Sequence, residues 1–204
     1  HFADMMRVLF GDPIEVSCAI FVSDTRRITG IPILGEADAD VEDSWHAVLS
    51  FEGGVRVAWT YSRSWYGEPI SCGRYFGREG TMSDRGFVFH PFQNGGDVTR
   101  ADGTVLSGQE IEERYLAGLD GEERRRLFPF GCTDGFAVEV RDFVNAVRTG
   151  AAPELDALEG MKTMALCEAC YESASLGAPV KFREVLDGTI ETYQAPVNAF
   201  WKIT

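Results

Sequence analysis

Residues 133–180 read TDGFAVEVRDFVNAVRTGAAPELDALEGMKTMALCEACYESASLGAPV, and they contain the two best-defined helical patterns in the chain. The apolar residues of the first pattern recur at helical spacings and make one face: Phe136, Val140, Phe143, Val144 and Val147. Asp134 is a suitable N-cap residue, and Gly150 stands where glycine commonly ends a helix. We therefore predict a helix over 134–150 whose apolar face needs something to pack on.

The second pattern begins at Asp156, with Glu159 three residues later in an acidic version of the capping box. Its apolar side chains spread over more than one helical face: Leu158, Met161, Met164, Ala165, Cys167, Ala169, Cys170 and Ala174. Gly177 and Pro179 mark its end. We predict a helix that is covered on two sides and forms an αα-hairpin with the first.

The rest of the chain reads mainly as antiparallel strands. An amphipathic helix over 2–10 is followed by an alternating strand over 14–22, and two further alternating runs, 45–51 and 55–61, flank the turn EGG. Two such runs about a glycine-bearing turn predict a hairpin. Helices and strands in this order indicate an α+β fold in one domain, residues 1–204, with an open, mostly antiparallel sheet and helices packed on one face.

The other segments are shorter. We predict strands over 70–76 and 81–84, a further short one over 86–90, and a hairpin about Asp102-Gly103, with polar helices over 109–119 and 122–127. Residues 23–43 read as a long loop or a poorly marked edge segment. Strand candidates follow at 180–182 and 190–193, and 195–204 read as a tail.

Composition narrows the class of partner. The formal net charge of −13 argues against nucleic acid or an anionic membrane surface, and no apolar run is long enough to cross a bilayer. Five scattered cysteines in a chain of this size favour reduced thiols and a cytoplasmic location. The first residue is His1, and helical periodicity starts at once, so we expect a piece of a longer protein.

Several possible sites are weak when taken from the residues alone. None of the 22 glycines is two positions from another, so the chain has no dinucleotide fingerprint, and no metal site stands out. Cys167 and Cys170 form a CxxC pair on an apolar helix face, which favours core packing. His1 precedes Asp4 by three residues at a helix start. The stretch WTYSRSWYGEP, residues 59–69, surrounds Arg63 with aromatic rings that suit a sugar or polyol, although such rings more often fill a sheet face or an interface.

Three segments resemble the C-terminal domain of the glucose–fructose oxidoreductase / inositol dehydrogenase / MocA-like (Gfo/Idh/MocA) family of NAD(P)-dependent oxidoreductases. HFADMMRVLFGDP is similar to the helix that follows the family's D-x-G-x-H-x-x-D motif, entered at its histidine. FEGGVRVAWTYS and YFGREGTM resemble its sheet hairpin and the strand after it. RDFVNAVRTGAAPELDALEGMKTMALCEACYESASLGAPVKF is similar to its closing helix pair, and this match is the most specific.

The resemblance implies the open sheet of a glyceraldehyde-3-phosphate-dehydrogenase-like C-terminal domain, which carries substrate contacts and a homodimer or homotetramer interface on its open face. NAD or NADP would be bound mainly by a preceding Rossmann domain, which is not in residues 1–204, so we expect the isolated chain to be inactive. His1 would exchange a proton with the hydroxyl of a small-molecule substrate, and Asp4 would support that helix and site. Arg63, Trp65 and Tyr66 are further candidates for substrate contacts.

Two other interpretations remain open at this stage. A non-catalytic dimerisation or small-ligand-binding module of the same fold would self-associate and would transfer no hydride. An enzyme that cleaves glycosides through transient oxidation would release hydrolysis products without net NADH.

Overall fold

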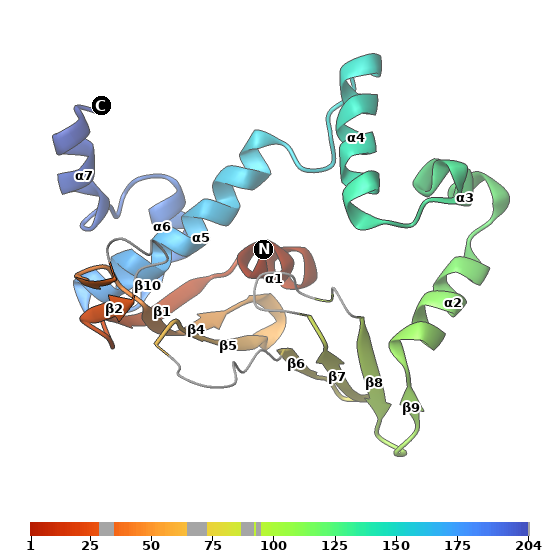
Figure 1. Cartoon of the computed structure of the whole chain (residues 1–204), viewed down its shortest axis with the longest axis horizontal. Helices are drawn as coiled ribbons and strands as arrows, with labels where there is room; N and C mark the ends of the chain where they lie inside the picture. Colours follow the sequence, from red (N-terminus) through yellow and green to blue (C-terminus); the bar gives the residue numbers. More distant parts are fainter. Residues whose placement is uncertain (29–34, 65–72, 87–91, 93–94, 204) are drawn as a thin grey trace. The chain divides into compact units, whose positions relative to one another are not determined.

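The computed structural model describes residues 1–28, 35–64, 73–86, 92 and 95–203. The chain forms two compact units. One, here called the terminal unit, contains residues 3–69 and 158–204, and the other, the central unit, contains residues 1–2 and 70–157. Helices and open antiparallel sheets make up both, so the prediction of an open α+β fold is confirmed. Figure 1 shows the elements in chain order.

The terminal unit is built on a four-stranded antiparallel sheet in the order β10-β1-β4-β5. Its strands are β1 (Glu15–Phe21), β4 (Ser44–Ser50), β5 (Arg56–Ser62) and β10 (Val180–Lys181). As predicted, β4 and β5 form a hairpin about residues 52–54, where Gly53 and Gly54 take positive φ angles of 68° and 83°. A side chain would strain both positions, which is why the turn uses glycine.

Helices cover one face of this sheet. The helix α1 (Phe2–Phe10) and the long helix α5 (Ala157–Leu176) lie over the same face (Figure 1). The core between them is completed by the short helix α6 (Phe182–Leu186). The most deeply buried apolar side chains of this core come from α1, from the sheet and the residue after β4, and from α5 and α6: Ala3, Val16, Leu49, Phe51, Leu166, Ala169, Val180 and Phe182. Burial alternates along β1 and along most of β4, as the alternating sequence patterns predict.

Two parts of the terminal unit differ from the prediction. Residues 190–193 are not a strand, and the supposed tail contains a helix, α7 (Gln194–Trp201). The buried carboxylate of Glu172 on α5 accepts hydrogen bonds from the backbone N–H groups of Tyr193 (2.9 Å) and Gln194 (3.1 Å). These are donors that the first turn of a helix leaves unpaired, so a residue from another element caps α7. Residues 23–43 also contain a small antiparallel ribbon, β2 (Arg26–Ile28) with β3 (Glu36–Asp38).

The central unit contains an antiparallel meander in the order β6-β7-β8-β9. Its strands are β6 (Gly73–Phe76), β7 (Gly80–Asp84), β8 (Gly96–Arg100) and β9 (Val105–Leu106). These match the predicted strands and the hairpin about Asp102-Gly103, whereas the strand expected over 86–90 falls largely outside the described residues. A Cβ atom on Gly80 would lie 2.3 Å from the carbonyl oxygen of Thr99, so the close approach of β7 to β8 requires glycine there.

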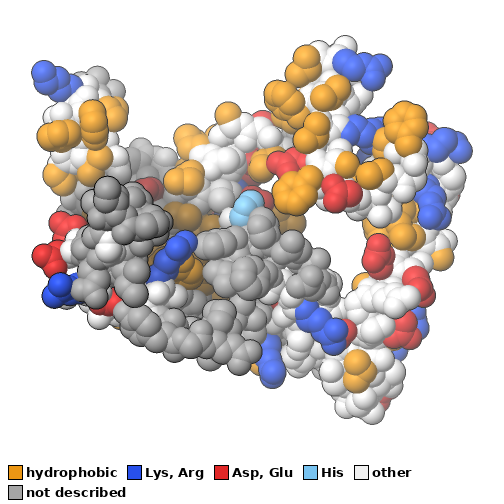
Figure 2. Space-filling view, in the orientation of Figure 1, with side chains coloured by type: hydrophobic (Ala, Val, Ile, Leu, Met, Phe, Trp, Pro, Cys, Tyr) orange, Lys and Arg blue, Asp and Glu red, His pale blue; other side chains and the backbone are white. Residues whose placement is uncertain are grey.

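Three helices follow in the central unit: α2 (Gly108–Gly118), α3 (Gly121–Leu127) and α4 (Gly135–Thr149). The predicted caps of α4 are confirmed, since Asp134 accepts from the N–H of Ala137 and Gly150 adopts the left-handed conformation. The apolar face of α4 is exposed, with Phe136, Phe143 and Val147 at 66%, 63% and 71% exposure. Figure 2 shows hydrophobic side chains on the surface where α4 lies in Figure 1.

Candidate functional site

The first candidate site lies at the start of α1. His1 is exposed and directly precedes the helix, and Asp4 lies in its first turn. Asp4 is held by α5: the Thr163 hydroxyl donates a hydrogen bond to its Oδ1 atom over 3.1 Å. The same hydroxyl accepts a 2.8 Å hydrogen bond from Nη1 of Arg7, so the side chain of Thr163 links Asp4 to Arg7.

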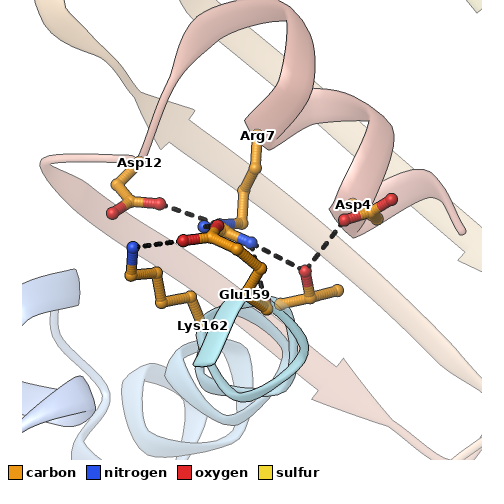
Figure 3. A network of polar contacts seen from close by, with 6 residues as sticks. Asp4, Arg7, Asp12, Glu159 and Lys162 are labelled. Carbon is orange, nitrogen blue, oxygen red and sulfur yellow. Dashed lines mark hydrogen bonds and ion pairs between the residues drawn. The ribbon is translucent and has the colours of Figure 1, made fainter. Parts of the chain in front are cut away.

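Arg7 is the centre of a polar network that joins α1 to α5 (Figure 3). Its side chain is 7% exposed, and its Nε and Nη2 atoms form ion pairs with Asp12 (2.8 Å) and Glu159 (2.7 Å). Nη1 also donates to the backbone carbonyl of Glu159 over 2.9 Å. Burial opposes the charge of Arg7, but the bonds to Glu159 and Asp12 outweigh it and raise its pKa.

The carboxylate of Glu159 has a second cationic partner, because Lys162 Nζ lies 2.6 Å from its Oε1 atom. Hydrogen bonds from Lys162 and Arg7 lower the pKa of Glu159, which keeps it ionised beside the guanidinium. The sequence pattern predicts a capping-box role for Glu159, whereas the structure shows its carboxylate paired with Arg7, a residue 152 positions away. The network fixes the start of α1, and with it the position of Asp4.

The second candidate site is at the end of β5, where Arg63 begins the connection that follows the strand. The N–H group of Arg63 donates to the carbonyl of Asp43 over 2.8 Å, and its Nε atom donates to the hydroxyl of Tyr61 over 2.7 Å. Tyr61 stacks on Trp45, with ring centroids 4.2 Å apart. Trp45 in turn meets Trp59 edge to face, with centroids 5.4 Å apart. Aromatic rings therefore support Arg63 on this side of the hairpin.

Asp43 anchors the backbone around Arg63. Its side chain is 2% exposed and accepts hydrogen bonds from the N–H groups of Ser23 and Asp24 and from the hydroxyls of Ser44 and Ser64, over 2.7–2.9 Å. Burial raises the pKa of Asp43, but the four hydrogen bonds act against burial and hold it well below its ordinary value. The carboxylate thus ties the β1 end, the β4 start and the β5 end together.

Among the predicted site residues, Asp4 and Arg63 make hydrogen bonds that hold them in place, whereas Trp65 and Tyr66 are not described by the structure. Asp4 is joined to α5, and Arg63 to the open end of the β4–β5 hairpin, so the two have different supports. Trp65 and Tyr66 lie outside the described residues. Cys167 and Cys170 pack in the terminal core. In the part of the chain that the structure describes, no group of three His, Cys, Asp or Glu side chains is placed to hold a metal ion.

Sequence reasoning missed Arg7, Thr163 and Asp43, which hold the two candidate sites. One signal was available for Arg7: it follows the apolar pair Met5-Met6, and a cation on the buried side of a helix needs an anionic partner. Nothing local marks Thr163 or Asp43, because all partners of Asp43 except Ser44, and those of Thr163, come from distant segments.

The indole nitrogen of Trp45 is buried and has no hydrogen-bond acceptor among the described residues. Buried polar groups normally have a partner, so a water molecule or a hydroxyl group of a ligand would satisfy this donor.

No helix within the described ranges has the length and apolarity that a membrane crossing demands.

Several solved oxidoreductase structures have a fold similar to that of this chain. An oxidoreductase domain protein from Kribbella flavida has a TM-score of 0.63 at 19% identity, covering 89% of this chain and 49% of that protein. An oxidoreductase from Agrobacterium radiobacter, in complex with NAD+, L-tartaric acid and magnesium, has a TM-score of 0.55 at 19% identity, with coverages of 89% and 47%. Levoglucosan dehydrogenase in complex with NADH and L-sorbose has a TM-score of 0.59 at 19% identity, with coverages of 88% and 47%.

At these identities the likeness establishes the fold. The chain spans less than half the length of each of these structures, and among curated proteins none matches it. The family model described as "Oxidoreductase family, C-terminal alpha/beta domain" matches residues 1–182, which is most of the chain. The match includes α1 with the Arg7 network, the β4–β5 hairpin with Asp43 and Arg63, and both helices of the stretch 133–180. The chain therefore belongs to the Gfo/Idh/MocA oxidoreductase family, and residues 1–182 correspond to the C-terminal alpha/beta domain of that family.

Proposed function

We propose that this chain is the substrate-binding and dimerisation domain of a cytoplasmic NAD(P)-dependent oxidoreductase that acts on a sugar, a polyol or a similar hydroxy compound. The observation that carries the proposal is the family match over residues 1–182. Two structures of the same fold add support, since one was solved with NADH and L-sorbose and another with NAD+ and L-tartaric acid. Both sorbose and tartaric acid carry at least two alcohol hydroxyl groups.

The dinucleotide is proposed to bind to a separate domain of the natural protein. The described strands pair only in antiparallel fashion, so they provide no parallel βαβ crossover, the element on which a pyrophosphate is usually held. The sequence also lacks the paired glycines of the dinucleotide fingerprint. The residues described here therefore do not fit NAD(P), and we assign no contact between them and the cofactor.

His1 is the proposed proton partner of the substrate hydroxyl. Oxidation of an alcohol carbon removes the hydroxyl proton as well as a hydride, and a neutral imidazole near pH 7 is well suited to accept that proton. Asp4 is the proposed positioning residue, because Thr163 and Arg7 hold it at the start of the helix that His1 precedes. Arg63, with Trp65 and Tyr66, is proposed to contact the substrate.

The test uses the complete natural protein and a panel of polyols and aldoses, with NAD+ and NADP+ supplied in turn. We expect NAD(P)-linked oxidation of at least one compound, and we expect His1→Ala to lower kcat by about 10²–10⁴-fold. Asp4→Asn should give a smaller loss. Asp38→Asn, at an exposed aspartate of β3, is the matched control and should leave turnover unchanged.

Two outcomes count against the proposal. An unchanged rate in His1→Ala would remove His1 from the mechanism. Absence of NAD(P)-linked turnover across the panel, in a protein that still self-associates, would favour a non-catalytic dimerisation or ligand-binding module.

The face of the β10-β1-β4-β5 sheet opposite the helices is the proposed dimer interface. It exposes apolar side chains on its two inner strands, with Phe21 of β1 at 40% and Val48 of β4 at 54% exposure. Phe21 also packs against the ring of His46, with centroids 5.4 Å apart. Val48→Lys should shift the mass measured by light scattering from dimer to monomer, because it places a charge in the interface. Val8→Lys, at an exposed valine of α1, is the control and should leave the dimer intact.

A further inference from the structure

Three cysteines lie at the contact between β1 and α5 in the terminal unit. Cys18 faces the helices from β1, and Cys167 and Cys170 lie on α5. Small side chains line the buried face of this helix, including Ala165, Ala169 and Ser173, and such side chains allow a helix to approach a sheet closely. Each of the three is a free cysteine.

A hydrogen bond from the backbone of Cys18 shows how closely α5 approaches β1. The N–H group of Cys18 donates to the hydroxyl oxygen of Ser173 over 2.9 Å, and that hydroxyl donates to the carbonyl of Ala178 over 2.9 Å. A serine hydroxyl oxygen lies about 2.4 Å from its own Cα atom, so the Cα of Ser173 is within roughly 5 Å of the Cys18 nitrogen. Cys170 is three residues earlier, on the same face of the helix. The side chains of Cys18 and Cys170 pack in the same core cluster and their thiols interact, so the two sulfur atoms lie within reach of each other.

The two thiols have different surroundings. Cys18 is partly exposed, whereas Cys170 is 5% exposed. A hydrogen bond from the Cys170 thiol outweighs burial and lowers the pKa of Cys18. The same interaction, together with burial, raises the pKa of Cys170. The thiol of Cys18 is therefore both the more accessible of the two and the one that more readily becomes a nucleophilic thiolate, whereas the thiol of Cys170 is buried.

We propose that Cys18 and Cys170 form an oxidation site that hydroperoxides convert to a disulfide between β1 and α5. The Cys18 thiolate attacks the terminal oxygen of a hydroperoxide, the O–O bond breaks, and an alkoxide or hydroxide leaves and takes up a proton. The sulfur of Cys18 is then a sulfenic acid. The Cys170 thiol attacks that sulfur, the S–S bond forms, and water is released. Two electrons pass from the two thiols to the peroxide, and a dithiol reductant reverses the change.

Peptide mapping tests the proposal on the full chain. The reduced protein is treated with an equimolar amount of hydrogen peroxide at pH 7, alkylated and digested without reduction. We expect a peptide that links Cys18 to Cys170 as the main product, in protein that keeps the size of the untreated sample. Cys132→Ser, at an exposed cysteine, is the matched control and should give the same peptide.

Two variants separate the steps. Cys170→Ala should stop the reaction at the sulfenic acid of Cys18, which a dimedone probe labels, and Cys18→Ser should abolish both the label and the link. Tryptophan fluorescence checks that each variant is folded. The proposal is overturned if the unsubstituted protein links Cys132 or Cys167 instead, or if Cys18 stays reduced while Cys132 is consumed. The unsubstituted protein alone decides between these results, so the test holds even if a variant fails to fold.

Discussion

Replacement of Arg7 by methionine tests whether the network between α1 and α5 stabilises the terminal unit. Methionine keeps much of the aliphatic volume but removes every donor. The variant loses two ion pairs and the hydrogen bonds to the Glu159 carbonyl and the Thr163 hydroxyl. Breaking a fully buried pair costs about 3–5 kcal/mol, and breaking an exposed pair about 0–1 kcal/mol.

Arg7 lies between these limits. Its own side chain is 7% exposed, but the carboxylates of Asp12 and Glu159 are 40% and 37% exposed and can be hydrated when the guanidinium is lost. We therefore expect a loss of about 2–3 kcal/mol in the free energy of unfolding. For a chain of this length, that corresponds to a fall in Tm of about 4–12 °C.

Urea denaturation followed by tryptophan fluorescence measures this loss. All four tryptophans fall within the residue ranges of the terminal unit, so the signal reports on that unit. Arg183→Met, at an exposed arginine of α6, is the control and should change stability by less than about 0.5 kcal/mol. Equal losses in the two variants would refute the reasoning, since Arg7 would then behave as a surface arginine.

Two further predictions concern buried carboxylates. The folded-state pKa of Asp43 is depressed, so its contribution to stability is present above about pH 4 and is lost as the pH falls toward the folded value. Asp43→Asn should therefore weaken the loss of stability between pH 4 and pH 2, measured by urea midpoints, whereas Asp38→Asn should leave that loss unchanged. Glu172→Gln should speed hydrogen exchange in α7 by about 5–100-fold, because a weaker acceptor then caps the helix; exchange unchanged from that of Glu184→Gln would contradict the capping role.

Most elements could be predicted from the sequence because their signals are local. The spacing of Phe136, Val140 and Val147 identified α4, and alternation about the EGG turn identified the β4–β5 hairpin. The predicted hairpin about Asp102-Gly103 also formed, with the N–H of Arg100 bonded to the carbonyl of Thr104. Periodicity and turn chemistry depend on neighbours within a few residues, so a single chain is enough to reveal them.

The helix α7 could not be predicted because its cap is not local. The donors at its start belong to Tyr193 and Gln194, and their acceptor, Glu172, lies 21 and 22 residues earlier on α5. No short pattern marks such a cap. The strand suggested over 190–193 was wrong for the same reason, since Tyr193 instead stacks on Tyr171, with ring centroids 4.7 Å apart.

The candidate sites were likewise predicted only in part from the sequence. The sequence by itself determined the residue types: a histidine and an aspartate at a helix start, and an arginine among aromatic rings. The tertiary structure decided which contacts hold them in place: Thr163 links Asp4 to Arg7, and the carbonyl of Asp43 accepts a hydrogen bond from the N–H of Arg63. An amphipathic period is a local property of one segment, whereas a buried charge is stable only beside partners that the fold brings from distant segments. Most elements of this protein could therefore be predicted from its sequence, whereas the cap of α7 and the contacts that support the candidate sites became visible only in the tertiary structure.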